Sequence, residues 1–147
     1  MRFAKITICR VHSETRRPDL NEELQHLGGA LGLFSQRDKD KSRFRIFIAL
    51  LKALKRGSVL SSDDLADALG LTRATVIHHL DGLMDAGIVE NVRGGYQLRV
   101  DNLEELLDVI QADINKTIAD LKEVARNVDR ELGLNAPREP AKNKTPY

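Results

Sequence analysis

The sequence predicts an α+β fold that is mainly helical, and three observations support this. Apolar residues make up 41% of the chain but aromatic residues only 4%, so the core must consist mainly of aliphatic side chains, which suit helix packing. Several segments repeat apolar residues at helical spacing between capping signals. Residues 88–100 instead alternate around Gly94-Gly95, a pattern typical of a two-stranded hairpin.

Residues 1–42 are expected to form an N-terminal extension. Residues 3–11 alternate between apolar and polar side chains, which permits a short strand. Asp19 followed by Glu22 has the form of a capping box, so a short helix is expected to begin there and to end near the next Gly-Gly pair. The polar run SQRDKDKSR, residues 35–43, is interpreted as a loop that leads to the next helix.

Three consecutive helices are expected after this loop. Residues 43–56 are apolar over most of the helix circumference, so this helix should be buried on more than one side. The S-x-x-D pattern at Ser61 starts a second helix, which stops at Gly70. Thr72 then caps a third helix over residues 73–86.

The order of helix, helix, tight turn, helix and hairpin predicts a winged helix-turn-helix domain over residues 43–100, whose third helix lies in the major groove of DNA. The face of that helix opposite its apolar side carries side chains that can donate to base edges and phosphates. Gly82 on the same helix is interpreted as allowing close approach to the groove. Arg93, at the hairpin tip, is a candidate phosphate or minor-groove contact. The candidates on the third helix are Arg73, Thr75, His78 and His79.

The segment LADALGLTRATVIHHLDGLMDAGIVE resembles the second and third helices of the ArsR-like winged helix-turn-helix transcriptional regulators. The closest pieces are ATVIHHL, residues 74–80, and AGIVE, residues 86–90. The resemblance covers about residues 43–100 and extends to the long helix that follows, which in that family often dimerises the protein. It implies DNA contacts at Thr72, Arg73, Thr75, His78 and His79.

The positive charge is concentrated before the helix-turn-helix. Residues 36–56 hold eight Lys or Arg against Asp38 and Asp40, whereas residues 63–100 carry a net charge of −3. A polyanion is therefore expected to contact the basic stretch, although these side chains are also compatible with a solvated loop and helix start. The candidate phosphate contacts are Arg37, Lys39, Lys41, Arg43 and Arg45.

Residues 101–132 are expected to form a long amphipathic helix, and residues 133–147 a disordered tail. The helix carries an apolar seam that is longer than one small helical domain can cover, which favours dimerisation over packing on its own domain. The expected dimer interface consists of Leu103, Leu107, Ile110, Ile114, Ile118, Leu121 and Val128.

Together these features predict a sequence-specific DNA-binding regulator that acts as a homodimeric repressor on double-stranded DNA. The alternative is a winged helix used for protein–protein contact in a transcription or other nucleic-acid assembly. Cys9 is the single cysteine, so we expect a reducing cytoplasm, a buried rather than redox-active thiol, and no cysteine-based metal site. The sequence offers no membrane span, catalytic motif or cofactor motif, and it identifies no effector.

Overall fold

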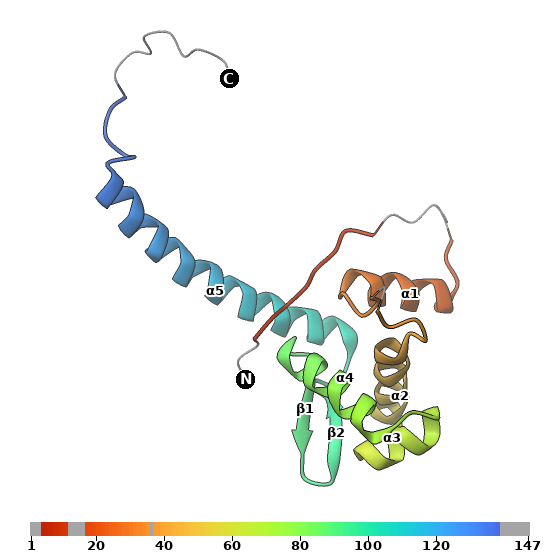
Figure 1. Ribbon diagram of the computed structural model, residues 1–147. Helices are drawn as coiled ribbons and strands as arrows, with labels where there is room; N and C mark the ends of the chain where they lie inside the picture. Colours follow the sequence, from red (N-terminus) through yellow and green to blue (C-terminus); the bar gives the residue numbers. More distant parts are fainter. Residues whose placement is uncertain (1–3, 12–16, 36, 139–147) are drawn as a thin grey trace. The chain divides into compact units, whose positions relative to one another are not determined.

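The computed structural model describes residues 4–11, 17–35 and 37–138 (Figure 1). The chain divides into two compact units, Met1–Ile110 and Gln111–Tyr147. The described elements are α1 (Leu20–Ala30), α2 (Ser42–Arg56), α3 (Ser62–Leu69), α4 (Arg73–Asp85), β1 (Val89–Val92), β2 (Gly95–Leu98) and α5 (Leu103–Leu132). The fold is thus α+β and mainly helical, as predicted. Part of the expected tail, residues 139–147, lies outside the described residues.

Three of the helices, α1, α3 and α4, begin at the side chains that the sequence indicated. The Asp19 carboxylate accepts a hydrogen bond from the Glu22 N–H at the start of α1. Ser61 and Asp64 form a reciprocal capping box at the start of α3. The Thr72 hydroxyl accepts from the Thr75 N–H at the start of α4. Each cap satisfies a backbone donor that the first helical turn leaves without a partner.

The core of the first unit lies where α2, α3, α4 and the hairpin meet, and Figure 1 shows these elements gathered together. Gly70 ends α3 with a φ of 66°, a left-handed conformation that glycine adopts without strain, and Thr72 begins α4 two residues later. This tight connection produces the helix-turn-helix. Its buried aliphatic and aromatic side chains include Phe47, Leu50, Leu65, Val76, Leu80 and Leu83.

The hairpin forms with a turn that differs by one residue from the expected one. Val92 pairs with Gly95, so the two turn residues are Arg93 and Gly94, not the two glycines. Leu60 also exchanges two backbone hydrogen bonds with Tyr96, which ties β2 to the connection before α3. A Cβ at Gly95 would clash with the Leu60 carbonyl oxygen, so the second glycine is needed for this close backbone contact.

The strand expected at residues 3–11 is wrong over residues 4–11, the part that the structure describes. This segment pairs with no described strand, and three of its backbone N–H groups donate to helix ends instead. The N–H groups of Ala4 and Lys5 donate to the Asp85 carbonyl, at 2.7 and 3.1 Å, and the Cys9 N–H donates to the Ala30 carbonyl. The thiol of Cys9 is exposed rather than buried, which is a second correction.

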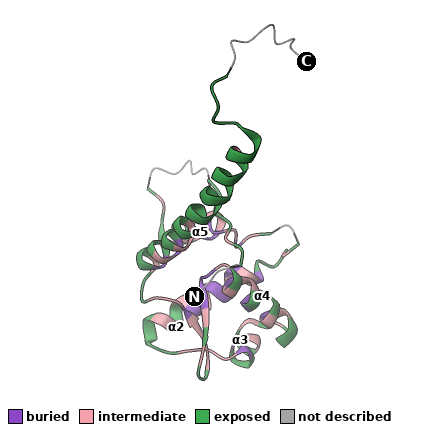
Figure 2. Ribbon diagram, turned by 90° about the vertical axis from the view of Figure 1, so that its left-hand side faces the viewer, coloured by how far each residue is buried: buried purple, intermediate pink, exposed green. Residues whose placement is uncertain are grey.

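α5 covers the predicted range, but its apolar stripe has two different environments. Leu106 and Ile110 belong to the core of the first unit and are 1% and 2% exposed. Beyond the unit boundary the stripe is open to solvent, and Figure 2 shows the later turns of α5 in the colour of exposed residues. The exposed apolar side chains there are Ile118, Leu121, Val124, Val128 and Leu132. In the described part of the chain, no helix is both long and apolar enough to cross a membrane.

Candidate nucleic-acid interface

The first turn of α4 carries polar side chains that are open to solvent. Arg73 is the first residue of the helix, and its guanidinium lies 3.7 Å from the Asp63 carboxylate, with 71% of each side chain exposed. An ion pair at this exposure contributes about 0–1 kcal/mol, so Arg73 can exchange its partner for a base or a phosphate at little cost.

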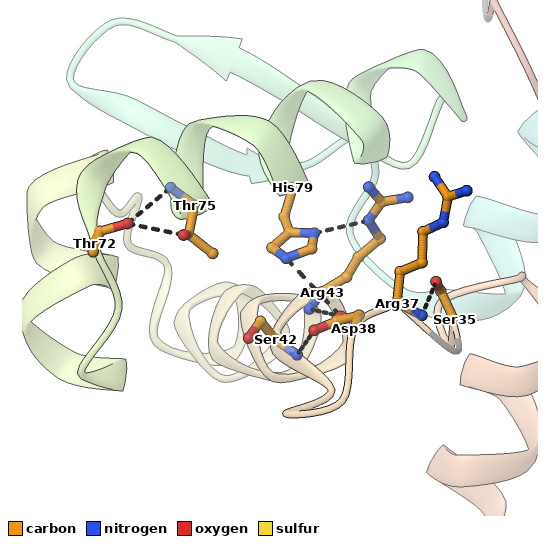
Figure 3. Close-up of polar contacts among 8 residues, drawn as sticks. All are labelled: Ser35, Arg37, Asp38, Ser42, Arg43, Thr72, Thr75 and His79. Carbon is orange, nitrogen blue, oxygen red and sulfur yellow. Dashed lines mark hydrogen bonds and ion pairs between the residues drawn. The ribbon is translucent and has the colours of Figure 1, made fainter.

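Two threonines are linked across the same turn. The Thr72 hydroxyl donates to the Thr75 hydroxyl at 2.8 Å while accepting from the Thr75 N–H at 3.1 Å (Figure 3). Thr72 therefore combines the capping role with an exposed position, and Thr75 is half-exposed. Both hydroxyls lie beside Arg73 at the end of α4 that the turn at Gly70 presents.

The two adjacent histidines of α4 lie in different environments. His78 is exposed, whereas His79 is buried at 8% exposure, although the sequence analysis placed both on or near the outer face. The Nδ1 atom of His79 accepts a hydrogen bond from Arg43 Nε at 3.2 Å, and its Nε2 atom lies 3.9 Å from the Asp38 carboxylate (Figure 3). The exposed side chain of His78 can therefore contact a molecule that binds to α4. His79 instead connects α4 to Asp38, which precedes α2, and to Arg43 at its start.

Asp38 is the centre of this connection and was not among the predicted functional residues. Its two carboxylate oxygens accept from the N–H groups of Ser42 and Arg43, at 2.9 and 3.0 Å, and so cap the start of α2. Lys41, the residue at the N-cap position itself, has a φ of 54° and makes no side-chain cap. An aspartate shortly before a predicted helix was the available sequence signal for this role.

The buried groups of the connection have shifted ionisation. Burial by itself raises the pKa of Asp38, but hydrogen bonds from the Arg43 and Ser42 N–H groups and the nearby His79 outweigh it, so the pKa is lowered overall. For His79, burial lowers the pKa, because it disfavours the charged imidazolium. The Asp38 carboxylate opposes this shift, whereas the nearby Arg43 and His78 add to it. His79 therefore favours its neutral form, which accepts the hydrogen bond from Arg43.

Gly82 has a role within the chain besides the one expected at the DNA groove. A Cβ at this position would lie 2.6 Å from Nη2 and 2.7 Å from Cζ of Arg43, so the missing side chain makes room for that guanidinium. Gly82 thus permits a close approach between α4 and Arg43 of the same chain, in addition to the expected approach of α4 to the DNA groove. Sequence alone gave no signal for this contact, because the two residues are far apart along the chain.

The remaining basic candidates fall into two groups. Arg45 donates from Nη2 to the Leu69 carbonyl at 2.7 Å, so it supports the end of α3. Arg37, Lys39 and Lys41 are exposed, and the Lys41 ammonium lies 5.4 Å from the centre of the Phe34 ring. These three exposed cations precede α2 in the basic stretch, as the charge pattern indicated.

The structure brings four of the predicted residues to one cavity of about 250 Å³ beside α4: Arg37, Arg43, His78 and His79, together with Gly32, Leu33, Ser35 and Asp38. Arg93 lies exposed in the hairpin turn and is not part of this cavity. The described residues contain no group of three or more His, Cys, Asp or Glu that could hold a metal ion.

The residues predicted for a dimer interface are not uniformly available to a partner chain. Ile110 is 2% exposed because it packs in the core of its own unit, so its assignment to the interface is corrected. Leu103 and Ile114 are half-buried. Leu107, Ile118, Leu121 and Val128 have exposed fractions of 41–56%.

Comparison with known proteins matches part of this chain to a family. Residues 48–91 match the family described as bacterial regulatory protein, arsR family. These residues cover most of α2, all of α3 and α4, and the start of β1. No curated protein matches the chain. The crystal structure of the AntR antimony-specific transcriptional repressor aligns with 24% sequence identity and a TM-score of 0.33, over 78% of this chain and 98% of that one.

Proposed function

We propose that this ArsR-like DNA-binding regulator is a dimeric repressor that reads the major groove with α4. The observation that carries the proposal is the exposed start of α4, where Thr72, Arg73, Thr75 and His78 offer donors and acceptors on the helix that follows the tight turn. Side chains of this kind at the N-terminal part of such a helix contact base edges in helix-turn-helix proteins.

The charge distribution supports the same orientation. Arg37, Lys39 and Lys41 are exposed near the start of α2, in the most basic stretch of the chain. Contacts between these side chains and phosphates would offset the negative net charge of residues 63–100. In this arrangement α4 would read the bases, and the basic stretch would provide much of the affinity for a duplex of any sequence.

The exposed apolar stripe on α5 supports the dimer. Two copies that pair through this stripe would present two α4 helices to half-sites separated by about one turn of DNA, roughly 34–36 Å. The operator is therefore an inverted repeat. A dimer bound to such an operator blocks access of RNA polymerase to an overlapping promoter, which is the simplest form of repression.

The test compares a specific operator with a random duplex of equal length. Arg73→Ala and His78→Ala should each weaken operator binding by about 1–3 kcal/mol and affect random duplex much less, because they remove base contacts. Arg126→Ala, which removes an exposed arginine from α5, is the matched control. Equal losses on both duplexes would assign Arg73 and His78 to phosphate contacts. Unchanged binding in both variants would favour a protein-binding winged helix instead.

A further inference from the structure

A second cavity, which shares Gly32, Leu33 and Arg43 with the first, lies against the other end of α4. Its volume is about 220 Å³, and we name it the Arg43 cavity. Its walls come from the N-terminal segment, the turn after α1, α2 and the end of α4, so four separate parts of the first unit enclose it. It is lined by Lys5, Thr7, Leu31, Gly32, Leu33, Arg43, Gly82, Leu83, Asp85 and Ala86.

The guanidinium of Arg43 is held in place at this cavity. Its Nε donates to Nδ1 of His79 at 3.2 Å, and its outer atoms lie against the backbone of α4 where Gly82 has no side chain. The hydrogen bond drawn from this guanidinium in Figure 3 comes from Nε, and the two η nitrogens point away from His79. A planar group fixed in this way presents two η nitrogens in the geometry that a carboxylate or phosphate accepts.

The other lining residues fit a small anion. Lys5 brings a second positive charge and Thr7 a hydroxyl group, while Asp85 is the acidic residue among those that line the cavity. The lining thus has two cationic residues against one anionic residue. Its volume is below the range of roughly 300–1,000 Å³ that is typical of pockets for drug-sized ligands, so the occupant has few heavy atoms. We infer that the Arg43 cavity binds a small oxyanion, a carboxylate or a phosphate, through the η nitrogens of Arg43.

The position of the cavity distinguishes it from a contact with the DNA backbone. It lies at Gly82–Ala86, ten or more residues after the cap at Thr72 and four or more after His78, the last α4 residue proposed to contact DNA. These separations correspond to about 15 Å and about 6 Å along the helix. Its opposite wall is the N-terminal segment, whose Ala4 and Lys5 N–H groups donate to the Asp85 carbonyl. An occupant would therefore contact both the N-terminal segment and the end of α4, whereas DNA is proposed to meet the start of α4.

The inference is tested by nuclear magnetic resonance titration of the full chain with inorganic phosphate and, separately, with succinate, at an ionic strength held constant by chloride. Saturable shifts of the Lys5, Gly32 and Gly82 amide signals are expected with at least one probe. Arg43→Gln should weaken that binding by about ten- to a hundredfold, as expected for loss of a charge-assisted contact. Arg37→Gln removes the same charge outside this cavity and should change binding less than about twofold.

Gly82→Ala provides an independent variant that keeps every charge. Its new methyl group would displace the Arg43 guanidinium, so it should weaken binding as much as Arg43→Gln does. Arg43→Lys keeps the charge without the planar fork and should weaken binding by about threefold or more. Thermal unfolding of each variant identifies those that are folded, and the comparison uses the folded ones.

Three results would overturn the inference. The first is the absence of saturable shifts with both probes. The second is an equal loss of binding in Arg37→Gln and Arg43→Gln, which would indicate a general charge effect. The third is a probe dissociation constant that rises in proportion to added duplex DNA, which would assign the site to a DNA phosphate. Because the duplex titration also measures DNA binding directly, failure of the oxyanion site and failure of the proposed DNA-binding function give different results.

Discussion

Replacing both Leu121 and Val128 with Glu puts two charges on the exposed apolar stripe of α5. The stripe residues Ile118, Leu121, Val124, Val128 and Leu132 are each 46–68% exposed in the single chain. Full burial of an aliphatic side chain contributes about 1.5–3 kcal/mol, so covering the remaining half of each contributes about 1 kcal/mol. A symmetric pair of helices gains roughly 10 kcal/mol in this way before the costs of association, against about 8 kcal/mol for a micromolar dimer.

The double variant removes about 4 kcal/mol of this gain from the pair and places four carboxylates in an apolar interface. The dimer dissociation constant should therefore rise by more than about a thousandfold. Lys116→Glu is the matched control, because it changes the charge of each chain by the same two units on the opposite face of the helix. Light scattering and sedimentation at several protein concentrations measure the oligomeric state.

A wild-type protein that is a monomer at all concentrations, or a double variant that dimerises as tightly as Lys116→Glu does, would show that the stripe does not form a dimer interface. Ile110 is unsuitable for this test, because its side chain is 2% exposed in the core of the first unit. A charge at Ile110 would unfold that unit, and a monomer obtained in this way would not report on the stripe.

Two further predictions concern pH and salt. The pKa of His79 is lowered in the folded chain, so its contribution to stability is complete above the unfolded pKa of about 6.5 and is lost as the pH falls through the folded value. The difference in unfolding free energy between wild type and His79→Gln, measured by urea titration, should therefore shrink from about pH 7.5 to pH 5. A difference that stays constant over this range would contradict the prediction. Replacing Arg37, Lys39 and Lys41 with Gln should flatten the slope of log affinity against log salt on duplex DNA by about two to three units, with sequence preference retained. An identical slope would show that these charges do not contact phosphates.

Local signals predicted most of the fold because they act within a few residues. The caps at Asp19, Ser61 and Thr72 each join a side chain to an N–H three residues later, so their spacing can be read directly from the sequence. The expected strand at residues 3–11 failed for the opposite reason. Alternation describes one strand only, and residues 4–11 have helix ends as hydrogen-bond partners instead of a neighbouring strand.

The polar connection beside α4 could not be predicted, because it depends on tertiary contacts. His79 and Arg43 are 36 residues apart, and their hydrogen bond exists only because α2 packs against α4. Helical spacing does place His79 beside the apolar face, three residues after Val76 and four before Leu83, but it does not identify the partners of its side chain. The small residue Gly82 likewise indicated a close contact on α4, but it did not show that an arginine side chain would occupy the space.

The α5 stripe was predicted as one row of residues at steps of three and four, and this missed Leu106 and Val124. Both lie at the edge of the same helix face, about 40° from the seam residue that follows four positions later. Leu106 is buried in the first unit, and Val124 is 57% exposed on the second. Sequence periodicity alone does not show which residues of the stripe are buried by the rest of the chain and which are exposed to solvent.

Sequencing the genomic fragments that the purified protein selects tests whether the chain is a dimer that reads DNA with α4. A dimer that reads DNA with α4 should select a recurring inverted repeat whose half-sites lie about 10 base pairs apart, centre to centre. The enrichment of this repeat should be lost in Arg73→Ala and kept in Arg126→Ala. Selection of no recurring sequence would contradict sequence-specific DNA binding, and selection of a single motif without a symmetric partner would contradict the dimer.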